Sequence, residues 1–370
     1  MTMAEVVVDL GAVAHNTAVL ARAVGGADVM AVVKADGFGH GAVPVARTAL
    51  EHGATWLGVT SAAEALSLRA AGLTAPTLLW MYPPTETFEE LLAARIDVSV
   101  GSVAALEAVA EAAGRTGLVA RVHLKADTGM SRGGAPAGEW PQLVAWARKF
   151  ELAGQLRVQG VWSHLASAET PGDPGLHRQL RAFDTAREAA TAAGLEPPVV
   201  HLANSAAALY LPETRFDLVR AGIALYGVEP VPGRTAGLRA AMTVRAQILL
   251  TKRVPAGTGV SYGPDHITDR ETTLALVPLG FADGVPRQAS GRAFVAIHGV
   301  RCPIVGRVSM DQVVADVGDL HVRPGDFAVM FGPGTDGEPT AAEWATWAGT
   351  NANDILTGIG ARLPRRYEPA

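Results

Sequence analysis

Residues 32–41 read V-V-K-A-D-G-F-G-H-G, a β-branched apolar run that ends in a lysine and is followed by a glycine-rich turn. In a βα unit this order places Lys34 at the carboxyl end of a strand, where barrel and open-sheet enzymes carry their chemistry. The apolar run would lower the local dielectric and favour the neutral, nucleophilic amine that a Schiff base requires. Because most lysines are solvated surface charges, this segment alone fits a strand end without function equally well.

Outward from this stretch, strand, turn and helix alternate from residue 11 to about residue 237. About eight such units in roughly 230 residues predict a (β/α)8 barrel. An open doubly wound sheet is the alternative, which is weakened because no G-x-G-x-x-G turn follows the first strand. The predicted barrel strands are 29–34, 56–59, 77–81, 97–100, 119–125, 158–163, 199–202 and 218–221.

After about residue 238 the sequence consists of short strand-like runs separated by Gly, Pro and Asp. We therefore predict two domains, a barrel at 1–237 and a mostly β domain at 238–370, with residues 230–237 as the linker. Within the second domain, 341–348 and 354–359 have helical patterns. The predicted strands are 242–254, 272–279, 293–298, 304–308, 313–317 and 327–331.

The composition narrows the class of protein. The 370 residues are 49% apolar and carry a formal charge of -5, which gives no reason to expect nucleic acid or an anionic membrane as a partner. The single cysteine, Cys302, excludes an intrachain disulfide and a cysteine-based metal site, and we expect no metal. The N-terminus lacks the regions of a secretory signal and no apolar run could cross a bilayer, so we expect a cytoplasmic protein.

Polar, mostly cationic side chains follow five of the predicted strands. In a barrel these positions lie on one rim, the face that carries catalysis. A rim this basic favours an anionic ligand. For His201, Asn204 and Asp127, a hydrogen-bonded turn residue without a role in binding is the alternative interpretation. The rim residues are Lys34, then Lys125 with Asp127 and Arg132, then His164, then His201 with Asn204 and Ser205, and then Arg220.

A phosphate site is predicted where Asn204 and Ser205 open a helix and where Gly222 and Ile223 follow Arg220. Backbone N–H groups at a helix start or a glycine turn bind phosphate oxygens, and a serine hydroxyl adds a donor. A reactive lysine, a phosphate site and a basic rim together indicate pyridoxal phosphate as the cofactor.

Seven motifs, in order along the chain, resemble those of the alanine racemases. That family consists of fold-type III pyridoxal-phosphate enzymes with an N-terminal (β/α)8 barrel and a C-terminal β domain. The resemblance extends from the first strand to L-P-R-R-Y at 363–367, and it is specific because all seven motifs fall in order on predicted strand ends. The motifs are V-V-K-A-D-G-F-G-H-G (32–41), L-K-A-D-T-G-M-S-R-G-G (124–134), W-S-H-L-A-S-A (162–168), H-L-A-N-S-A (201–206), L-V-R-A-G-I-A-L-Y-G (218–227), V-S-Y-G (260–263) and G-R-V-S-M-D-Q (306–312).

The resemblance implies a two-base interconversion of L- and D-alanine, which would supply D-alanine for the bacterial cell wall. Lys34 would carry the cofactor and act as the base on one face of the substrate Cα. Tyr262 of a partner subunit would act on the other face, so the enzyme would be a homodimer with shared active sites. Since the unperturbed pKa of tyrosine is about 10, nearby cations would have to lower it, and His164 and Arg132 are the candidates.

The resemblance also implies that Arg220 hydrogen-bonds the pyridine nitrogen. Because an arginine keeps its proton, that nitrogen would stay unprotonated, which favours racemisation over transamination. It also favours racemisation over decarboxylation, the reaction that related barrel enzymes catalyse. Arg132 and the backbone of Met310, again from the partner, would hold the substrate carboxylate. Lys125 corresponds to a lysine that is carbamylated in some members of the family. The remaining implied residues are His164, Asn204, Ser205, Gly222 and Ile223 around the cofactor, and His201, Asp311 and Asn353 in supporting positions.

Three aromatic positions depart from the family pattern, because Phe38, Phe281 and Asn353 stand where tyrosines are usual. Phe38 and Asn353 remove phenol donors from the phosphate. Each lost hydrogen bond to a charged group costs about 1.5–3 kcal/mol of binding free energy, less whatever a replacing water molecule restores. Asn353 would also widen the pocket and offer a donor and an acceptor, so we expect serine to be accepted better than by a usual alanine racemase. The alternatives are a racemase of several small amino acids, a weakly active pyridoxal-phosphate carrier and a binding protein without catalysis.

Overall fold

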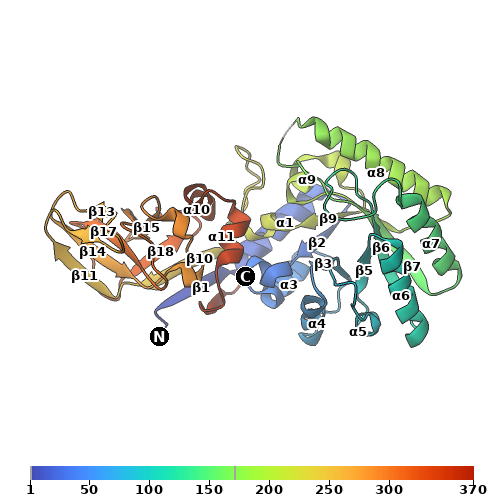
Figure 1. The fold of residues 1–370 in the computed structure, drawn as a ribbon, viewed down its shortest axis with the longest axis horizontal. Coiled ribbons are helices and arrows are strands. Elements are labelled where there is room, and N and C mark those ends of the chain that lie inside the picture. The colour runs from blue at the N-terminus through green and yellow to red at the C-terminus, as the bar shows by residue number, and fades with distance from the viewer. Residues whose placement is uncertain (1, 171) are drawn as a thin grey trace.

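The structure, a computed structural model, describes residues 2–170 and 172–370. It contains a barrel of parallel strands surrounded by helices and, beside it, a region built mostly of antiparallel strands (Figure 1). The C-terminus of the chain lies near the junction between the two regions. In the described part of the chain, no helix is both long enough and apolar enough to span a bilayer.

Eight parallel strands form the barrel, which confirms the predicted fold class. They are β2 (Asp28–Val32), β3 (Trp56–Val59), β4 (Thr77–Leu79), β5 (Asp97–Val100), β6 (Ala120–Lys125), β7 (Leu156–Trp162), β8 (Val199–His201) and β9 (Leu218–Ala221). Their order in space is β8-β7-β6-β5-β4-β3-β2-β9. Between the two end strands, the N–H of Asp217 donates to the Val200 carbonyl (3.0 Å) and the N–H of Arg220 to the Ala203 carbonyl (2.9 Å), so the barrel is nearly closed.

Helices connect the barrel strands. They are α1 (Leu10–Val24), α2 (Lys34–Phe38), α3 (Ala42–Glu51), α4 (Ala62–Ala70), α5 (Glu89–Ala93), α6 (Val103–Thr116), α7 (Trp140–Leu152), α8 (Pro174–Ala192) and α9 (Ser205–Tyr210), with 3₁₀ turns η1 (Pro212–Thr214) and η2 (Ile223–Tyr226). Several begin at side-chain caps. Ser61 and Glu64 form a capping box at the start of α4, and Ser102 caps α6.

The second region contains two sheets and a two-stranded ribbon. Its strands are β1 (Ala4–Asp9), β10 (Met242–Gln247), β11 (Leu250–Val254), β12 (Gly259–Val260), β13 (His266–Ile267), β14 (Thr272–Val277), β15 (Phe294–Ile297), β16 (Val300–Pro303), β17 (Val313–Gly318), β18 (Phe327–Phe331) and β19 (Arg365–Glu368). The sheets have the orders β16-β15-β18-β10-β1-β19 and β11-β14-β17, and the ribbon is β12-β13. The helical elements are η3 (Phe281–Asp283), η4 (Arg287–Ala289), α10 (Ala341–Ala348) and α11 (Ala352–Gly358).

The first strand of the chain lies in the sheet of the second region. β1 pairs antiparallel with β10, with Val6 opposite Val244, and parallel with β19, with Val6 opposite Arg365. The two regions are therefore joined at both ends of the barrel sequence. The boundary between residues 237 and 238 stays a prediction.

Two of the predicted strands in this region are wrong. The predicted strand 242–254 is two strands, β10 and β11, which lie in different sheets. The predicted strand 304–308 is not regular, because β16 ends before it and Ile304 makes an isolated bridge to Ala315. Gly306 then turns the chain at a φ of 73°, where a Cβ would meet a backbone carbonyl oxygen at 2.7 Å.

Candidate active site

A cavity of about 500 Å³ lies at the carboxyl ends of the barrel strands and is bordered on one side by α11. Most of the predicted site residues lie here, because the residues that follow parallel strands share one rim of a barrel. The predicted residues that line the cavity are Lys34, Lys125, Arg132, His164, Asn204, Ser205, Arg220, Gly222, Ile223 and Asn353.

The turn that contains Lys34 is left-handed. The lysine was expected to end a strand, but β2 ends two residues earlier and Lys34 is the first residue of α2. For residues other than glycine, the left-handed conformation costs about 1–2 kcal/mol each. Such strain persists only where the surrounding structure fixes it. The φ values are 52° at Ala35, 51° at Asp36, 62° at Gly37 and 53° at Phe38.

Side-chain hydrogen bonds hold this left-handed turn. Glu64 accepts with one carboxylate oxygen from the N–H of Ala35 (2.7 Å) and with the other from the N–H of Thr60 (2.8 Å), which precedes α4. Asp36 accepts from the N–H of Ala42 (2.8 Å) at the start of α3. The turn is thus tied to the beginnings of two helices, and Lys34 has a fixed backbone.

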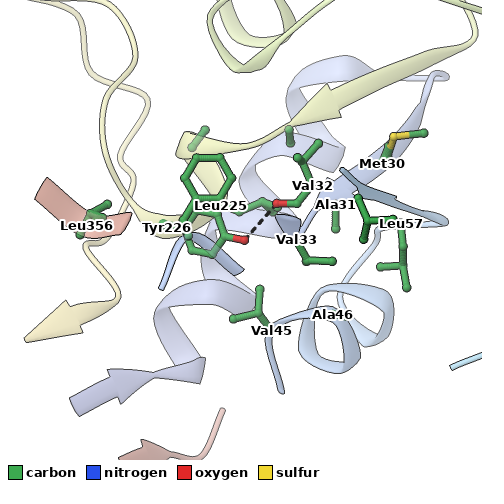
Figure 2. Close-up of a cluster of buried hydrophobic side chains, with 14 of the residues drawn as sticks. Met30, Ala31, Val32, Val33, Val45, Ala46, Leu57, Leu225, Tyr226 and Leu356 are labelled. Atoms are coloured by element: carbon green, nitrogen blue, oxygen red, sulfur yellow. Dashed lines mark hydrogen bonds between the residues drawn. The ribbon is translucent and has the colours of Figure 1, made fainter. Parts of the chain in front are cut away.

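The strand before Lys34 is packed in an apolar cluster, in which the Tyr226 hydroxyl donates to the Val32 carbonyl at 3.0 Å (Figure 2). Burial lowers the pKa of the Lys34 amine, the nearby charge of Arg132 lowers it further, and Glu64 partly opposes both. The amine is therefore shifted toward its neutral, nucleophilic form, as the apolar run predicted.

The predicted phosphate site is assembled around Ser205. Its hydroxyl oxygen accepts from the N–H groups of Gly222 (2.9 Å) and Ala224 (3.3 Å), and a hydroxyl that accepts can still donate its own hydrogen. Asn204 caps α9 by accepting from the N–H of Ala207 (3.1 Å), which is the hydrogen-bonded role given above as its alternative interpretation.

Phe38 borders the same phosphate site. A Cβ on residue 222 would lie 3.3 Å from the Cζ of Phe38, so the tip of the ring, where a tyrosine carries its hydroxyl, lies close to Gly222. The cavity therefore joins a nucleophilic lysine, a guanidinium and a cradle of serine and glycine. These groups fit an aromatic aldehyde that carries a phosphate, which is the chemistry of pyridoxal phosphate.

Arg220 is almost completely buried, and its guanidinium donates several hydrogen bonds within the barrel. Its guanidinium donates to the carbonyls of Ser163 (2.8 Å) and Leu202 (3.0 Å) and to Nδ1 of His201 (3.0 Å), which is itself fully buried. Burial lowers the pKa of Arg220 to about 9, so the side chain stays charged and stays a donor near neutral pH.

The pKa values of two other basic residues beside Arg220 are also lowered. Burial, followed by the charges of Arg220 and Arg132, lowers the pKa of His164 to about 3. This histidine is therefore neutral near pH 7 and is not one of the cations expected to lower the pKa of Tyr262, which leaves Arg132. The same three causes lower the pKa of Lys125 to about 8.

Three predicted residues lie on the second region instead. Tyr262 is 71% exposed and Met310 is 56% exposed, and neither is among the described residues that line the cavity. Asp311 forms an ion pair with Arg362 at 2.9 Å. Tyr262 and Phe281 border a separate hollow of about 660 Å³. A single chain therefore does not bring Tyr262 into the cavity of Lys34.

Sequence reasoning missed some residues of the cavity. The Trp162 ring has two cations over it, with the Lys125 Nζ 4.5 Å and the Arg220 guanidinium carbon 4.7 Å from its centroid. A signal was present, because Trp162 lies near the carboxyl end of the predicted strand 158–163, where the side chains of a barrel strand reach the catalytic rim. The missed residues that line the cavity include Trp80, Trp162 and Glu169.

Two family descriptions match almost the whole chain. "Alanine racemase, N-terminal domain" matches residues 8–230, and "Alanine racemase, C-terminal domain" matches residues 241–367. The chain belongs to the alanine racemase family. The order of the two matches agrees with the order of the barrel and the β-rich region.

Individual alanine racemases resemble the chain over its full length. The alanine racemase of Thermobifida fusca (strain YX) is 52% identical over 370 residues, which cover 100% of this chain and 99% of that protein. The crystal structure of the alanine racemase from Streptomyces lavendulae has a TM-score of 0.98 at 46% identity and covers 100% of this chain and 98% of that one. The alanine racemase from Bartonella henselae, crystallised with covalently bound pyridoxal phosphate, has a TM-score of 0.90 at 31% identity and covers 100% of both chains.

Proposed function

We propose that this chain interconverts L- and D-alanine with pyridoxal phosphate as its cofactor. Membership of the alanine racemase family makes it an amino-acid racemase of this kind, and the cavity residues fit the cofactor. The observation that carries the assignment is Lys34, a lysine of lowered pKa that shares one cavity with Arg220 and the Ser205 cradle. Supply of D-alanine to the bacterial cell wall is the role that we propose for the product.

Different residues of the cavity would bind the cofactor, bind the substrate and transfer the proton. When bound, pyridoxal phosphate withdraws electrons from the substrate and makes its Cα hydrogen acidic. Lys34 would hold the cofactor, and its Nζ would remove or return the hydrogen at one face of Cα. Ser205 and the backbone at Gly222 and Ile223 would hold the phosphate, and Arg132 would hold the substrate carboxylate.

Arg220 would set the type of reaction. Arg220 would donate a hydrogen bond to the pyridine nitrogen and keep its proton, so the ring would withdraw fewer electrons than a protonated pyridine. The negative charge at Cα would then be short-lived and would be quickly neutralised by a returning proton. This favours racemisation over reactions that need a long-lived charge.

A second copy of this chain would complete the site. The proposal is supported by Tyr262 and Met310, large apolar side chains that are mostly exposed although they stand in motifs of the family. In a homodimer, Tyr262 of the partner subunit would act on the other face of Cα, and the backbone at Met310 of the partner subunit would help Arg132 to hold the carboxylate.

Serine is a second candidate substrate. Asn353 lies on α11 and lines the cavity, where the family usually has a tyrosine, and its amide can donate to and accept from a hydroxyl. Serine differs from alanine by one hydroxyl, which a smaller polar residue accommodates better than a large ring.

The test is exchange of the Cα hydrogen in heavy water, followed by proton NMR and separation of the isomers on a chiral column. L-alanine and L-serine are incubated separately with the protein, with and without added pyridoxal phosphate. Deuterium at Cα together with the D-isomer supports racemisation and ranks the two substrates. A protein that binds the cofactor but exchanges neither substrate would favour the carrier interpretation.

A further inference from the structure

A line of buried polar side chains crosses the barrel interior from the cavity to the opposite ends of the strands. Arg220 Nη1 lies 3.0 Å from His201 Nδ1, His201 Nε2 lies 2.9 Å from His123 Nδ1, and His123 Nε2 lies 3.2 Å from an oxygen of Asp97. Asp97 is the first residue of β5, whereas His201 is the last residue of β8. Asp97 and both histidines are fully buried.

The position of each hydrogen in this line follows from its two ends. Arg220 can only donate, so His201 must accept at Nδ1 and, as a neutral ring, carries its hydrogen on Nε2. That hydrogen points at Nδ1 of His123, which must also accept, so the hydrogen of His123 is on Nε2 and is donated to Asp97. All three hydrogen bonds therefore point from the guanidinium to the carboxylate.

The surroundings keep the two rings in these orientations. Trp162 stacks on His201 with ring centroids 5.3 Å apart and planes 3° apart. Trp56 meets the edge of His123 at 5.6 Å and 80°. At the far end, Arg121 Nε lies 2.8 Å from the other oxygen of Asp97, and this arginine is one-third exposed. Arg121 Nη2 also donates to the oxygen that His123 contacts (3.2 Å), so the buried carboxylate is shared between Arg121 and the line of side chains that leads to Arg220.

We propose that Asp97 and His123 are positioning residues that tune Arg220. Through the two imidazoles, the Asp97 carboxylate strengthens the hydrogen bond from Arg220 to His201 and makes Arg220 a weaker hydrogen-bond donor toward the cavity. Hydrogen bonds in a chain polarise one another, and the low dielectric of a barrel core strengthens the effect. The inference rests on the proposed contact between Arg220 and the pyridine nitrogen.

Loss of the Asp97 charge would therefore strengthen Arg220 as a donor and lengthen the life of the charge at Cα. A longer life allows the proton to return to the cofactor carbon instead of Cα. Alanine and pyridoxal phosphate then become pyruvate and pyridoxamine phosphate, a transfer of the amino group and two electrons that needs no other oxidant. Pyruvate released per racemisation event measures this side reaction.

The first experiment determines which ring nitrogens of His123 and His201 carry a hydrogen. The cofactor-loaded wild-type protein is labelled with ¹⁵N-histidine, and the ring nitrogens of His123 and His201 are assigned by comparison with His123→Asn. We expect both rings to carry hydrogen on Nε2 and none on Nδ1. A hydrogen on Nδ1 of either ring, or on both nitrogens, would overturn the proposal without involving catalysis.

The second experiment compares Asp97→Asn with Arg121→Gln. We expect Asp97→Asn to raise pyruvate per racemisation event about tenfold, as a change of one pKa unit in the donor would. Arg121→Gln removes the ion pair at the same end of the barrel but leaves the carboxylate, so it should cause no rise. A rise in both variants, or in neither, would mean that Asp97 acts only on stability. Racemisation by the wild-type protein in the same assay tests the proposed function separately.

Discussion

Backbone strain at single residues marks the segments that the sequence motifs identified. In the described part of the chain eight residues other than glycine have positive φ, and five of them lie within the sequence motifs that contain predicted site residues. Such conformations cost roughly 1–3 kcal/mol each and collect at functional sites, where they aim a side chain. The five are Ala35, Asp36 and Phe38 after Lys34, Ser131 before Arg132 and Ser261 before Tyr262.

Restoring the family's usual phenol at position 38 should tighten cofactor binding. The Cζ of Phe38 lies close to Gly222, so Phe38→Tyr would place a hydroxyl beside the proposed phosphate site. A hydrogen bond to a charged group contributes about 1.5–3 kcal/mol, which lowers the dissociation constant about tenfold or more. Titration of cofactor-free protein with pyridoxal phosphate, followed by absorbance, measures this constant. Phe281→Tyr, at the separate hollow, is the control, and an equal effect in both variants would contradict the placement.

The side chain at position 353 should control the ratio of serine to alanine turnover. Asn353→Tyr is expected to lower serine turnover several-fold more than alanine turnover, because the ring fills the space and offers no matching amide. Asn353→Ala keeps the space and removes the amide, so it separates size from hydrogen bonding. Initial rates with both substrates give the ratio. An unchanged ratio in Asn353→Tyr would remove serine as a substrate favoured by this residue.

At the scale of the element, the capping glutamates of α4 and α10 each have a second partner: Glu64 contacts the turn of Lys34, whereas Glu343 forms an ion pair with Arg301. Glu64 and Glu343 each accept N–H groups at the start of their own helix, but Glu64 also accepts from Ala35 in the left-handed turn. A glutamine cannot accept on both sides, because one of its two ends is a donor. Glu64→Gln must therefore release either its own helix or the turn that holds Lys34.

Glu64→Gln and Glu343→Gln should both lower the free energy of unfolding, by about 1–3 kcal/mol each. Glu64→Gln alone should also slow the attachment of pyridoxal phosphate to the cofactor-free protein, since the lysine backbone is no longer fixed. Denaturant unfolding and the absorbance change on mixing measure the two effects. Equal attachment rates in the two variants would show that the turn does not depend on Glu64.

The elements of the barrel were predictable and the geometry of its turns was not. All eight parallel strands were predicted close to their observed positions, because buried parallel strands are short apolar runs between glycine-ended helices. The left-handed turn at Ala35 and Asp36 was not predicted, since residues other than glycine adopt it only when distant groups such as Glu64 impose it. β1 was missed as part of the second sheet because its partners, β10 and β19, lie more than 200 residues away in the sequence.

At the scale of the whole molecule, the two regions meet at the turn of Lys34. Arg365 Nε donates to the Gly39 carbonyl at 3.0 Å, and a Cβ on Gly39 would lie 2.7 Å from the Leu356 carbonyl oxygen. The second region therefore packs directly against the segment that follows the lysine. Its exposed Tyr262 lies on another part of the same region, which is the part that we propose for a partner's site.

Shared active sites predict that two inactive variants restore activity when their subunits are mixed. We expect Lys34→Ala and Tyr262→Phe each to abolish or strongly reduce racemisation when each variant pairs with itself. A heterodimer has one site with an intact Lys34 from one chain and an intact Tyr262 from the other. After unfolding and refolding of an equal mixture, about one quarter of wild-type activity should return if chains pair at random. No recovery, with dimers present by size-exclusion chromatography, would contradict a shared site.

The most direct test of the central claim is to find which lysine carries the cofactor. The protein loaded with pyridoxal phosphate is reduced with borohydride, digested and analysed by mass spectrometry. Lys34 and Lys125 both have a lowered pKa and both line the cavity, so the two lysines are real competitors. We predict the reduced adduct on the peptide that contains Lys34 and none on the peptide that contains Lys125. An adduct on Lys125, or on neither peptide, would contradict the role given to Lys34 and its left-handed turn.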